Sequence, residues 1–191
     1  MYANWPHRAE VPALVLRAVA TAEGLDFPLC VHPATGRLLH ALAGGVPPGG
    51  RIGETGTGTG AGLAWMLTAA PPGTEIVSVE VDPERAAACR DLFAEHPKVT
   101  LLEGDAGLVF ERGPYDLLVL DGGWGSGKRG DPTIDPLAVL KPGGTFTVDD
   151  LTPERPEEAD PARRHWLGHP DLHATEVRVA PDCSVLLCRR R

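Results

Sequence analysis

Residues 51–62, RIGETGTGTGAG, place an acid before glycines that alternate with other residues from Gly56 to Gly62. Glycine inside a strand or helix costs roughly 0.5–1 kcal/mol relative to alanine, so such a run needs a compensating reason. One reason is a backbone that turns tightly and lets a ligand approach its amides, as nucleotide-binding loops between a strand and a helix do. The alternative is a flexible linker of glycine and threonine. The flanking residues therefore decide whether this run binds a nucleotide.

A second group that fits nucleotide chemistry is Glu80, which ends the apolar run EIVSVE. It lies about 20 residues beyond the glycines, where an acid accepts hydrogen bonds from both hydroxyls of a ribose. A single acid of this kind is most often a surface residue. Together with the glycine run, Glu80 is predicted to be a ribose ligand.

The elements that must position these groups alternate along the chain. Strand patterns cover residues 51–55, 75–81, 99–104, 115–123 and 143–151, and helical patterns cover 13–25, 35–45, 61–70, 83–96 and 132–140. A charged helix or loop and a hairpin over 173–190 follow, with Pro181 and Asp182 at the turn. Alternating strands and helices predict a parallel sheet. The glycine run lies between a strand and a helix, which favours the nucleotide loop over the linker.

Length and charge limit the classes of protein. The 191 residues fit a single domain, residues 1–191, large enough to bury a core without disulfides or metals. A net charge of -8 disfavours nonspecific binding to nucleic acid. We expect a cytoplasmic protein with no membrane partner, because no apolar run approaches about 20 residues and the first residues lack a signal-peptide pattern. Four scattered cysteines are expected to be reduced thiols, namely Cys30, Cys89, Cys183 and Cys188.

Two cofactor classes compete for the glycine run. GTGTGA, residues 56–61, satisfies the G-x-G-x-x-[GA] pattern of dinucleotide enzymes. A dehydrogenase of this kind normally needs a second substrate domain, for which this chain has little room. Motifs further along the chain indicate the second class of cofactor.

Five motifs in order resemble those of the class I S-adenosylmethionine (SAM)-dependent methyltransferases. ETGTGTG is similar to their glycine loop, VSVEVDPE to the acid motif of the second strand and EGDA to the adenine-contacting segment. YDLLVLDGG and VLKPGGTFTVDD are similar to the motifs of the fourth and fifth strands. The terminal hairpin matches the family's antiparallel sixth and seventh strands. The resemblance implies an α/β fold, with a doubly wound, mostly parallel seven-stranded sheet and an antiparallel C-terminal hairpin.

The resemblance also implies SAM as the cofactor and a set of residues that bind it. These residues are Glu54, Thr55, Gly56, Gly58, Gly60, Glu80, Val81, Gly104, Asp105, Ala106 and Asp121. Glu54 is expected to serve the ammonium of the amino-acid tail, directly or through water. Asp105 is expected to accept from the adenine amino group, beside the backbone amide of Ala106. The alternative role for Asp105 is a helix N-cap after Gly104.

Within that superfamily the nearest resemblance is to the small catechol-type O-methyltransferases. Residues 1–48 are then expected to be N-terminal helices that cover the pocket, and residues 49–191 the sheet core. In that family an acid after the fourth strand and an Asp-Asn pair after the fifth hold a divalent cation. The corresponding residues here are Asp121, Asp149 and Asp150, the last in place of asparagine, and the implied ion is magnesium or calcium. The alternative is that Asp150 points outward and Asp121 faces the acceptor.

The general base is the point where the chain departs from this family. Trp124 stands where the family has a lysine that takes the acceptor proton. Lys128, in the loop GGWGSGKRG, and Asp121 are the candidate catalytic residues, although a loop lysine is more commonly solvated. His32 is a weaker candidate for the base. Trp124 either stacks on a flat acceptor or packs the loop down.

The resemblance implies transfer of a methyl group from SAM to an oxygen of a small-molecule acceptor, by in-line displacement. The product of the cofactor is S-adenosylhomocysteine (SAH). Family analogy also implies a homodimer that completes the pocket. Two alternatives stay open: an NAD(P)-dependent oxidoreductase, and a non-catalytic protein that binds the cofactor but has lost acceptor chemistry.

Overall fold

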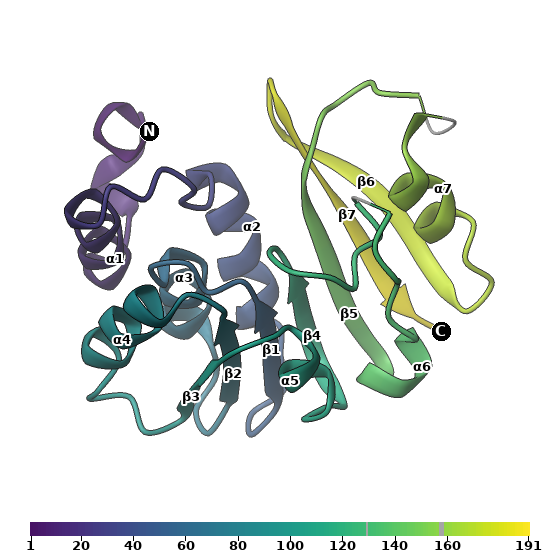
Figure 1. Ribbon diagram of the computed structural model, residues 1–191. Helices are drawn as coiled ribbons and strands as arrows, with labels where there is room; N and C mark the ends of the chain where they lie inside the picture. Colours follow the sequence, from purple (N-terminus) through teal and green to yellow (C-terminus); the bar gives the residue numbers. More distant parts are fainter. Residues whose placement is uncertain (129, 157–158) are drawn as a thin grey trace.

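The computed structural model describes residues 1–128, 130–156 and 159–191, and within them seven strands form one sheet. The strand order is β3-β2-β1-β4-β5-β7-β6 (Figure 1). The strands are β1 Arg51–Thr55, β2 Glu75–Glu80, β3 Val99–Glu103, β4 Tyr115–Leu120, β5 Leu140–Leu151, β6 Leu172–Ala180 and β7 Cys183–Arg190. The predicted mostly parallel sheet with its terminal hairpin is confirmed.

The register of the sheet brings several strand ends to one edge. Strands β1 to β5 run parallel, whereas β7 is antiparallel to both β5 and β6. Thr55 of β1 lies opposite Val79 of β2 and Leu120 of β4. The chain order reverses between β1 and β4, and open α/β sheets place their ligand crevice at such a point, beyond the carboxyl ends of the strands. Glu80 and Asp121 both stand at this edge.

Strand β4 shows why a run such as residues 117–120 is apolar throughout. Leu117 and Val119 pack into the core on one face of the sheet, and Leu118 and Leu120 pack into the core on the other. Successive side chains of a strand point to opposite faces, so a strand that is covered on both sides has no polar face.

Helices cover both faces of the sheet (Figure 1). One core contains side chains of α1 Ala13–Gly24, α2 Pro33–Gly44, α3 Ala61–Ala69 and α4 Pro83–Leu92. The other contains side chains of α5 Gly107–Phe110, α6 Pro136–Val139 and α7 Pro161–Leu167. Two short 3-10 helices, η1 Tyr2–Asn4 and η2 Arg8–Glu10, precede α1.

Two helices are several residues shorter than predicted, and proline and capping chemistry explain both. α4 ends at Leu92 and does not reach His96, which precedes Pro97, because the residue before a proline avoids helical dihedral angles. The helix predicted over residues 132–140 is reduced to α6. There Asp135 Oδ1 accepts from the Leu137 amide at 2.8 Å, so the helix begins only after this cap.

Arg163 of α7 is a buried cation that joins three elements. Its side chain is 1% exposed. The guanidinium contacts Asp160 Oδ2 at 2.6 Å, both carboxylate oxygens of Glu176 at 2.8 Å and the Thr152 carbonyl at 2.5 Å. A buried charge is costly unless it is paired and hydrogen-bonded, which it is here. This network ties α7 and β6 to the residue that follows β5.

The cysteines agree with the expectation of reduced thiols. All four cysteines are free thiols. Burial raises the pKa of the Cys89 and Cys188 thiols to about 12. Among the described residues, no helix combines the length and the apolar composition that crossing a bilayer requires.

Candidate functional site

A cavity of about 650 Å³ lies at the carboxyl edge of β1, β2, β4 and β5. Residues 27–31, between α1 and α2, also line it. The predicted residues that line the cavity are Glu54, Gly56, Gly58, Glu80 and Val81 from the first two strands and the segments that follow them, and Gly104, Asp105, Ala106, Asp121, Lys128, Asp149 and Asp150 from later segments. Two predicted cofactor residues lie behind this wall: Thr55 is buried in the sheet, and Gly60 is the N-cap of α3.

The glycine run is folded against the sheet by its own amides. Gly56 and Thr57 both donate their backbone N–H to the carbonyl of Val79 at 3.0 Å. Gly56 has a φ of 77°, and a Cβ at this position would lie 2.5 Å from backbone atoms of Gly122. A side chain at Gly56 therefore collides with the chain that follows β4. These glycines permit close contact between two loops, which excludes the flexible linker.

Glu80 is held at the end of β2 by three residues. The Gly58 amide donates to Oε2 at 2.7 Å, and the Asp82 amide donates to Oε1 at 3.0 Å. Arg85 contacts Oε1 through Nη2 at 2.7 Å, and its guanidinium carbon lies 4.7 Å from the ring centre of Phe27. The acid and the glycine loop thus face one cavity, as predicted. Sequence reasoning missed Arg85, although a basic residue in the first turn of the helix after the acid is a signal that identifies it.

Glu54 lies at the end of β1 and is 2% exposed. Ser78 donates its hydroxyl to Glu54 Oε2 at 2.5 Å, and the Thr57 and Ser78 hydroxyl oxygens are 2.6 Å apart. Burial is the main cause that raises the pKa of Glu54 to about 8. The Ser78 bond opposes this shift, and the charges of Asp149 and Glu80 add to it. At neutral pH the carboxyl of the free protein is therefore mostly protonated.

Asp105 follows β3 and binds two donors through one oxygen. Its Oδ1 accepts from the Gly107 amide at 2.9 Å and from Trp124 Nε1 at 2.6 Å. The Trp124 bond is the main cause that holds the pKa of Asp105 below its ordinary value. Both bonds use Oδ1, so the turn contact with Gly107 does not compete with a ligand at Oδ2. Trp124 also packs edge-on against Phe110 at a centroid distance of 4.9 Å, so it packs the loop down.

Asp121, Asp149 and Asp150 come together as predicted. One carboxylate oxygen from each lies within 4.8 Å of the others. Burial is the main cause that raises the pKa of Asp121 well above its ordinary value, and also that of Asp149. Asp150 is exposed and has a φ of 54°. It is therefore open to solvent and still able to offer an oxygen to the cluster.

Lys128 reaches from the loop after β4 into this group of acids. Its Nζ donates to Asp149 Oδ1 at 3.3 Å, to the Asp149 carbonyl at 3.1 Å and to the Asp121 carbonyl at 3.2 Å. The side chain is 17% exposed, so it is not the solvated loop lysine of the alternative.

His32, the weaker base candidate, does not line the cavity. Its Nδ1 accepts from the Ala34 amide at 3.1 Å, which makes it the N-cap of α2. The helix consequently begins at Pro33, two residues before its predicted start. His32 acts as a helix cap in this structure.

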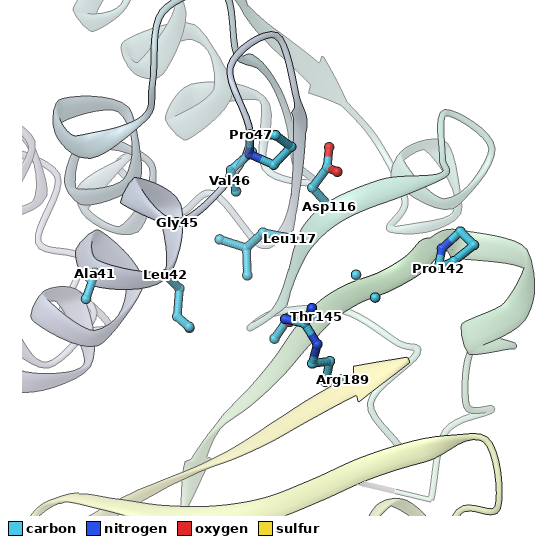
Figure 2. A pocket seen from close by; sticks show the side chains of 12 residues that line it. Ala41, Leu42, Gly45, Val46, Pro47, Asp116, Leu117, Pro142, Thr145 and Arg189 are labelled. Atoms are coloured by element: carbon cyan, nitrogen blue, oxygen red, sulfur yellow. The ribbon is translucent and has the colours of Figure 1, made fainter. Parts of the chain in front are cut away.

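A second hollow, of about 380 Å³, lies at the opposite edge of the sheet, where the parallel strands begin. Figure 2 shows Asp116, Leu42 and Arg189 among its side chains. Asp116 Oδ2 accepts from Lys141 Nζ and from the Arg51 amide, each at 2.7 Å, so its charge is already paired. Because none of the predicted site residues lines this hollow, the cavity at the carboxyl edge is the candidate site.

Solved structures with a similar fold include O-methyltransferases. One, an O-methyltransferase of tomaymycin synthesis from Streptomyces achromogenes in complex with SAM, is 23% identical, with 94% of this chain and 91% of that chain covered and a TM-score of 0.72. An O-methyltransferase from Bacillus cereus in complex with SAH is 16% identical over 100% of both chains, with a TM-score of 0.75. A cofactor-bound protein from MTB is 22% identical, with 94% and 90% covered and a TM-score of 0.75.

No protein-family model matches the chain, and no curated protein matches it in sequence. The likeness to the solved structures establishes the fold: the chain has the Rossmann-like fold of the SAM-dependent methyltransferases.

Proposed function

We propose that this protein transfers a methyl group from SAM to an oxygen of a small-molecule acceptor. The observation that carries the proposal is the hydrogen bond from the Gly58 amide to Glu80 Oε2, at 2.7 Å. It joins a buried acid to a glycine loop at the wall of a cavity, which is the combination that an adenosine ligand needs. Structures of similar fold in complex with SAM or SAH support the choice of cofactor.

Each part of the cofactor has a matching group in this proposal. Glu80 accepts from the ribose hydroxyls, and Val81 offers an apolar, 72% exposed side chain to the adenine. Asp105 accepts from the adenine amino group beside the Ala106 amide. Glu54 holds the ammonium of the amino-acid tail, and this positive charge favours the ionised form of the Glu54 carboxyl. The glycine loop leaves room for the backbone to approach the tail.

The acceptor side of the proposal uses Asp121 and Lys128. When bound, SAM supplies a methyl group on a positively charged sulfur, which is the electrophile of the transfer. Asp121 takes the proton of the acceptor hydroxyl, and burial, which raises the pKa of this carboxyl, makes its ionised form a stronger base. The oxygen then forms the new bond to the methyl carbon as the bond from carbon to sulfur breaks. Lys128 stabilises negative charge on the acceptor oxygen.

The cluster of acids was predicted to bind magnesium or calcium, and its oxygen ligands suit such ions. The positive charge of Lys128 beside these oxygens makes the cluster less suitable for a divalent ion. Lys128 Nζ already lies 3.3 Å from Asp149 Oδ1, and an ammonium repels a divalent ion that shares its carboxylate. No step of the proposed transfer therefore uses a metal.

Calorimetry with SAM and SAH tests cofactor binding. We expect both to bind, and Glu80→Ala to weaken binding by about 1.5–3 kcal/mol, roughly 10- to 150-fold, because charged hydrogen bonds to the ribose are lost. Glu84→Ala, an exposed acid in the first turn of α4, is the matched control and is expected to leave the affinity unchanged. Absence of binding at millimolar ligand contradicts the proposal. Binding of NADH in place of SAM supports the oxidoreductase alternative.

Methyl transfer itself is tested with isotopically labelled SAM and an unfractionated cell extract. The proposal expects a labelled product whose methyl group is attached to oxygen, identified by mass spectrometry. Cofactor binding without any labelled product, in the extract and with phenols, catechols and carboxylates, supports the non-catalytic alternative.

A further inference from the structure

The ammonium of Lys128 contacts the carboxylate of Asp149, one of the three acids in the cluster of Asp121, Asp149 and Asp150. We propose that Lys128 is a built-in cation of this cluster, which keeps divalent metal out and takes over its electrostatic role toward the acceptor oxygen. This inference rests on the proposed function, because it assigns the charge that assists methyl transfer at the same site.

The contacts of Lys128 resemble the coordination of a bound cation. Three oxygens surround Nζ at 3.1–3.3 Å, two of them main-chain carbonyls of Asp121 and Asp149 and one a carboxylate oxygen of Asp149. An ammonium has three N–H groups and no acceptor, so these oxygens use all of its donors. A lysine that removes a proton needs a free lone pair on nitrogen, which this arrangement does not offer. The geometry therefore assigns Lys128 an electrostatic role.

The loop that carries Lys128 is anchored through Ser126. The Lys128 amide donates to Ser126 Oγ at 3.3 Å, and Trp166 Nε1 donates to the Ser126 carbonyl at 2.7 Å. Trp166 is fully buried and packs against Phe146 at a centroid distance of 4.8 Å. A fixed backbone reduces the conformational freedom that the lysine side chain loses when it enters the cluster. The charge is thus held in place before any ligand binds.

The charge around Lys128 explains why the cluster holds a cation at all. Asp121, Asp149 and Asp150 present carboxylates to one another, and Glu54 lies close enough to Asp121 to act on it electrostatically. Like charges at this spacing repel strongly in a buried site, and an ammonium among them offsets the repulsion. A divalent ion that enters beside Lys128 must share the Asp149 carboxylate with an ammonium, and the two positive charges repel each other. Lys128 and a divalent ion therefore compete for the Asp149 carboxylate.

The experiment measures binding of Mn²⁺ by electron paramagnetic resonance, with saturating SAH present. We expect wild type to bind Mn²⁺ weakly or not at all, and Lys128→Met to bind it at least about tenfold more tightly, because a positive charge has left the cluster. Asp149→Asn in the Lys128→Met background is expected to abolish the gain. Lys141→Met is the matched control, since Lys141 pairs with Asp116 at 2.7 Å away from the cavity, and it is expected to leave Mn²⁺ binding unchanged.

Three outcomes overturn the inference. Wild type that binds Mn²⁺ as tightly as Lys128→Met shows that the ammonium does not exclude the metal. If Lys128→Met binds no Mn²⁺, the oxygens of the cluster do not form a cation site. Lys128→Gln replaces this variant if Lys128→Met does not fold. Wild-type methyl transfer that EDTA abolishes and Mg²⁺ restores shows that a metal is required. Failure of SAH to bind wild type is a different result, since it rejects the proposed function itself.

Discussion

Trp124 donates its indole N–H to Asp105 Oδ1 at 2.6 Å, and so joins the loop after β4 to the turn after β3. Asp105 lies on the part of the cavity assigned to adenine, and the loop that carries Trp124 also carries Lys128. The bond fixes the Asp105 carboxylate by one oxygen, which leaves the other for a ligand. A change at Trp124 is therefore expected to alter recognition of the adenine amino group.

Trp124→Phe tests this relationship, because it removes the donor and keeps an aromatic ring against Phe110. We expect affinity for SAH to fall about two- to tenfold, the range for one hydrogen bond. We also expect a smaller preference for SAH over its inosine analogue, which has oxygen in place of the amino group. The measurement is calorimetry with both ligands.

Trp5→Phe is the matched control for that substitution. Trp5 Nε1 is buried and has no hydrogen-bond partner among the described residues, so phenylalanine removes no bond there. If Trp124→Phe keeps the full preference for SAH, then Trp124 only packs the loop and does not orient Asp105.

A comparison of Gly56→Ala with Gly49→Ala separates the effect of a steric contact on stability from the effect of a positive φ. Both glycines have a positive φ, 77° and 71°, but a Cβ meets Gly122 at 2.5 Å at Gly56 and nothing within 4 Å at Gly49. We expect Gly56→Ala to lower the free energy of unfolding by about 1–3 kcal/mol more than Gly49→Ala, the cost of overpacking. Urea unfolding measures the difference. Equal losses in the two variants contradict the steric role of Gly56.

The pKa of Glu54, about 8, predicts that cofactor binding releases a proton. Below this pKa the free carboxyl is protonated, whereas the ammonium of the ligand favours the carboxylate. SAH affinity is therefore expected to rise as pH increases from about 6 to about 7.5, by up to about tenfold per unit, and to level off near the pKa.

Calorimetry in two buffers of different ionisation enthalpy counts the protons released near pH 6.5. We expect close to one proton for wild type and none for Glu54→Gln, which cannot titrate. Affinity that does not change with pH, with no proton release, shows that Glu54 does not meet the ammonium.

Arg163→Met tests the buried network that ties α7 to β6. Removing Arg163 leaves buried Asp160 and partly exposed Glu176 without their cation, for which we expect a loss of about 3–5 kcal/mol in the free energy of unfolding. Arg178→Met is the control, because Arg178 pairs with Glu154 at 2.7 Å with both side chains at least half exposed. There we expect about 1 kcal/mol or less. Comparable losses in urea unfolding contradict a structural role for Arg163.

The features that could be predicted from the sequence are those that depend on residues close together in the chain. The run from Leu117 to Leu120 packs alternately on two faces, so its continuous apolar character indicated a strand covered on both sides. The glycine spacing around Gly58 and the position of Glu80 likewise indicated a nucleotide loop before any contact was known. These features depend on local patterns of two to about 20 residues.

The contacts of the long loop after β4 could not be predicted from such local patterns. Trp124 binds Asp105 across 19 residues, and Trp166 holds Ser126 across 40. Whether Lys128 enters the cavity depends on this anchoring, so the sequence left a solvated lysine and a catalytic one as alternatives. The cap that His32 forms on the Ala34 amide is local, yet the expected helix began after it.

The position of β7 between β5 and β6 also determines the order in which the chain is able to fold during its synthesis. β6 leaves the ribosome before β7, yet it reaches the sheet only through β7. The five parallel strands can pair while the chain is still growing, whereas β6 and α7, joined by Arg163 and Glu176, must wait. Until β7 emerges, β5 presents an open strand edge, the kind of surface by which unfinished chains aggregate. The hairpin thus completes the sheet and removes this hazard in one late step.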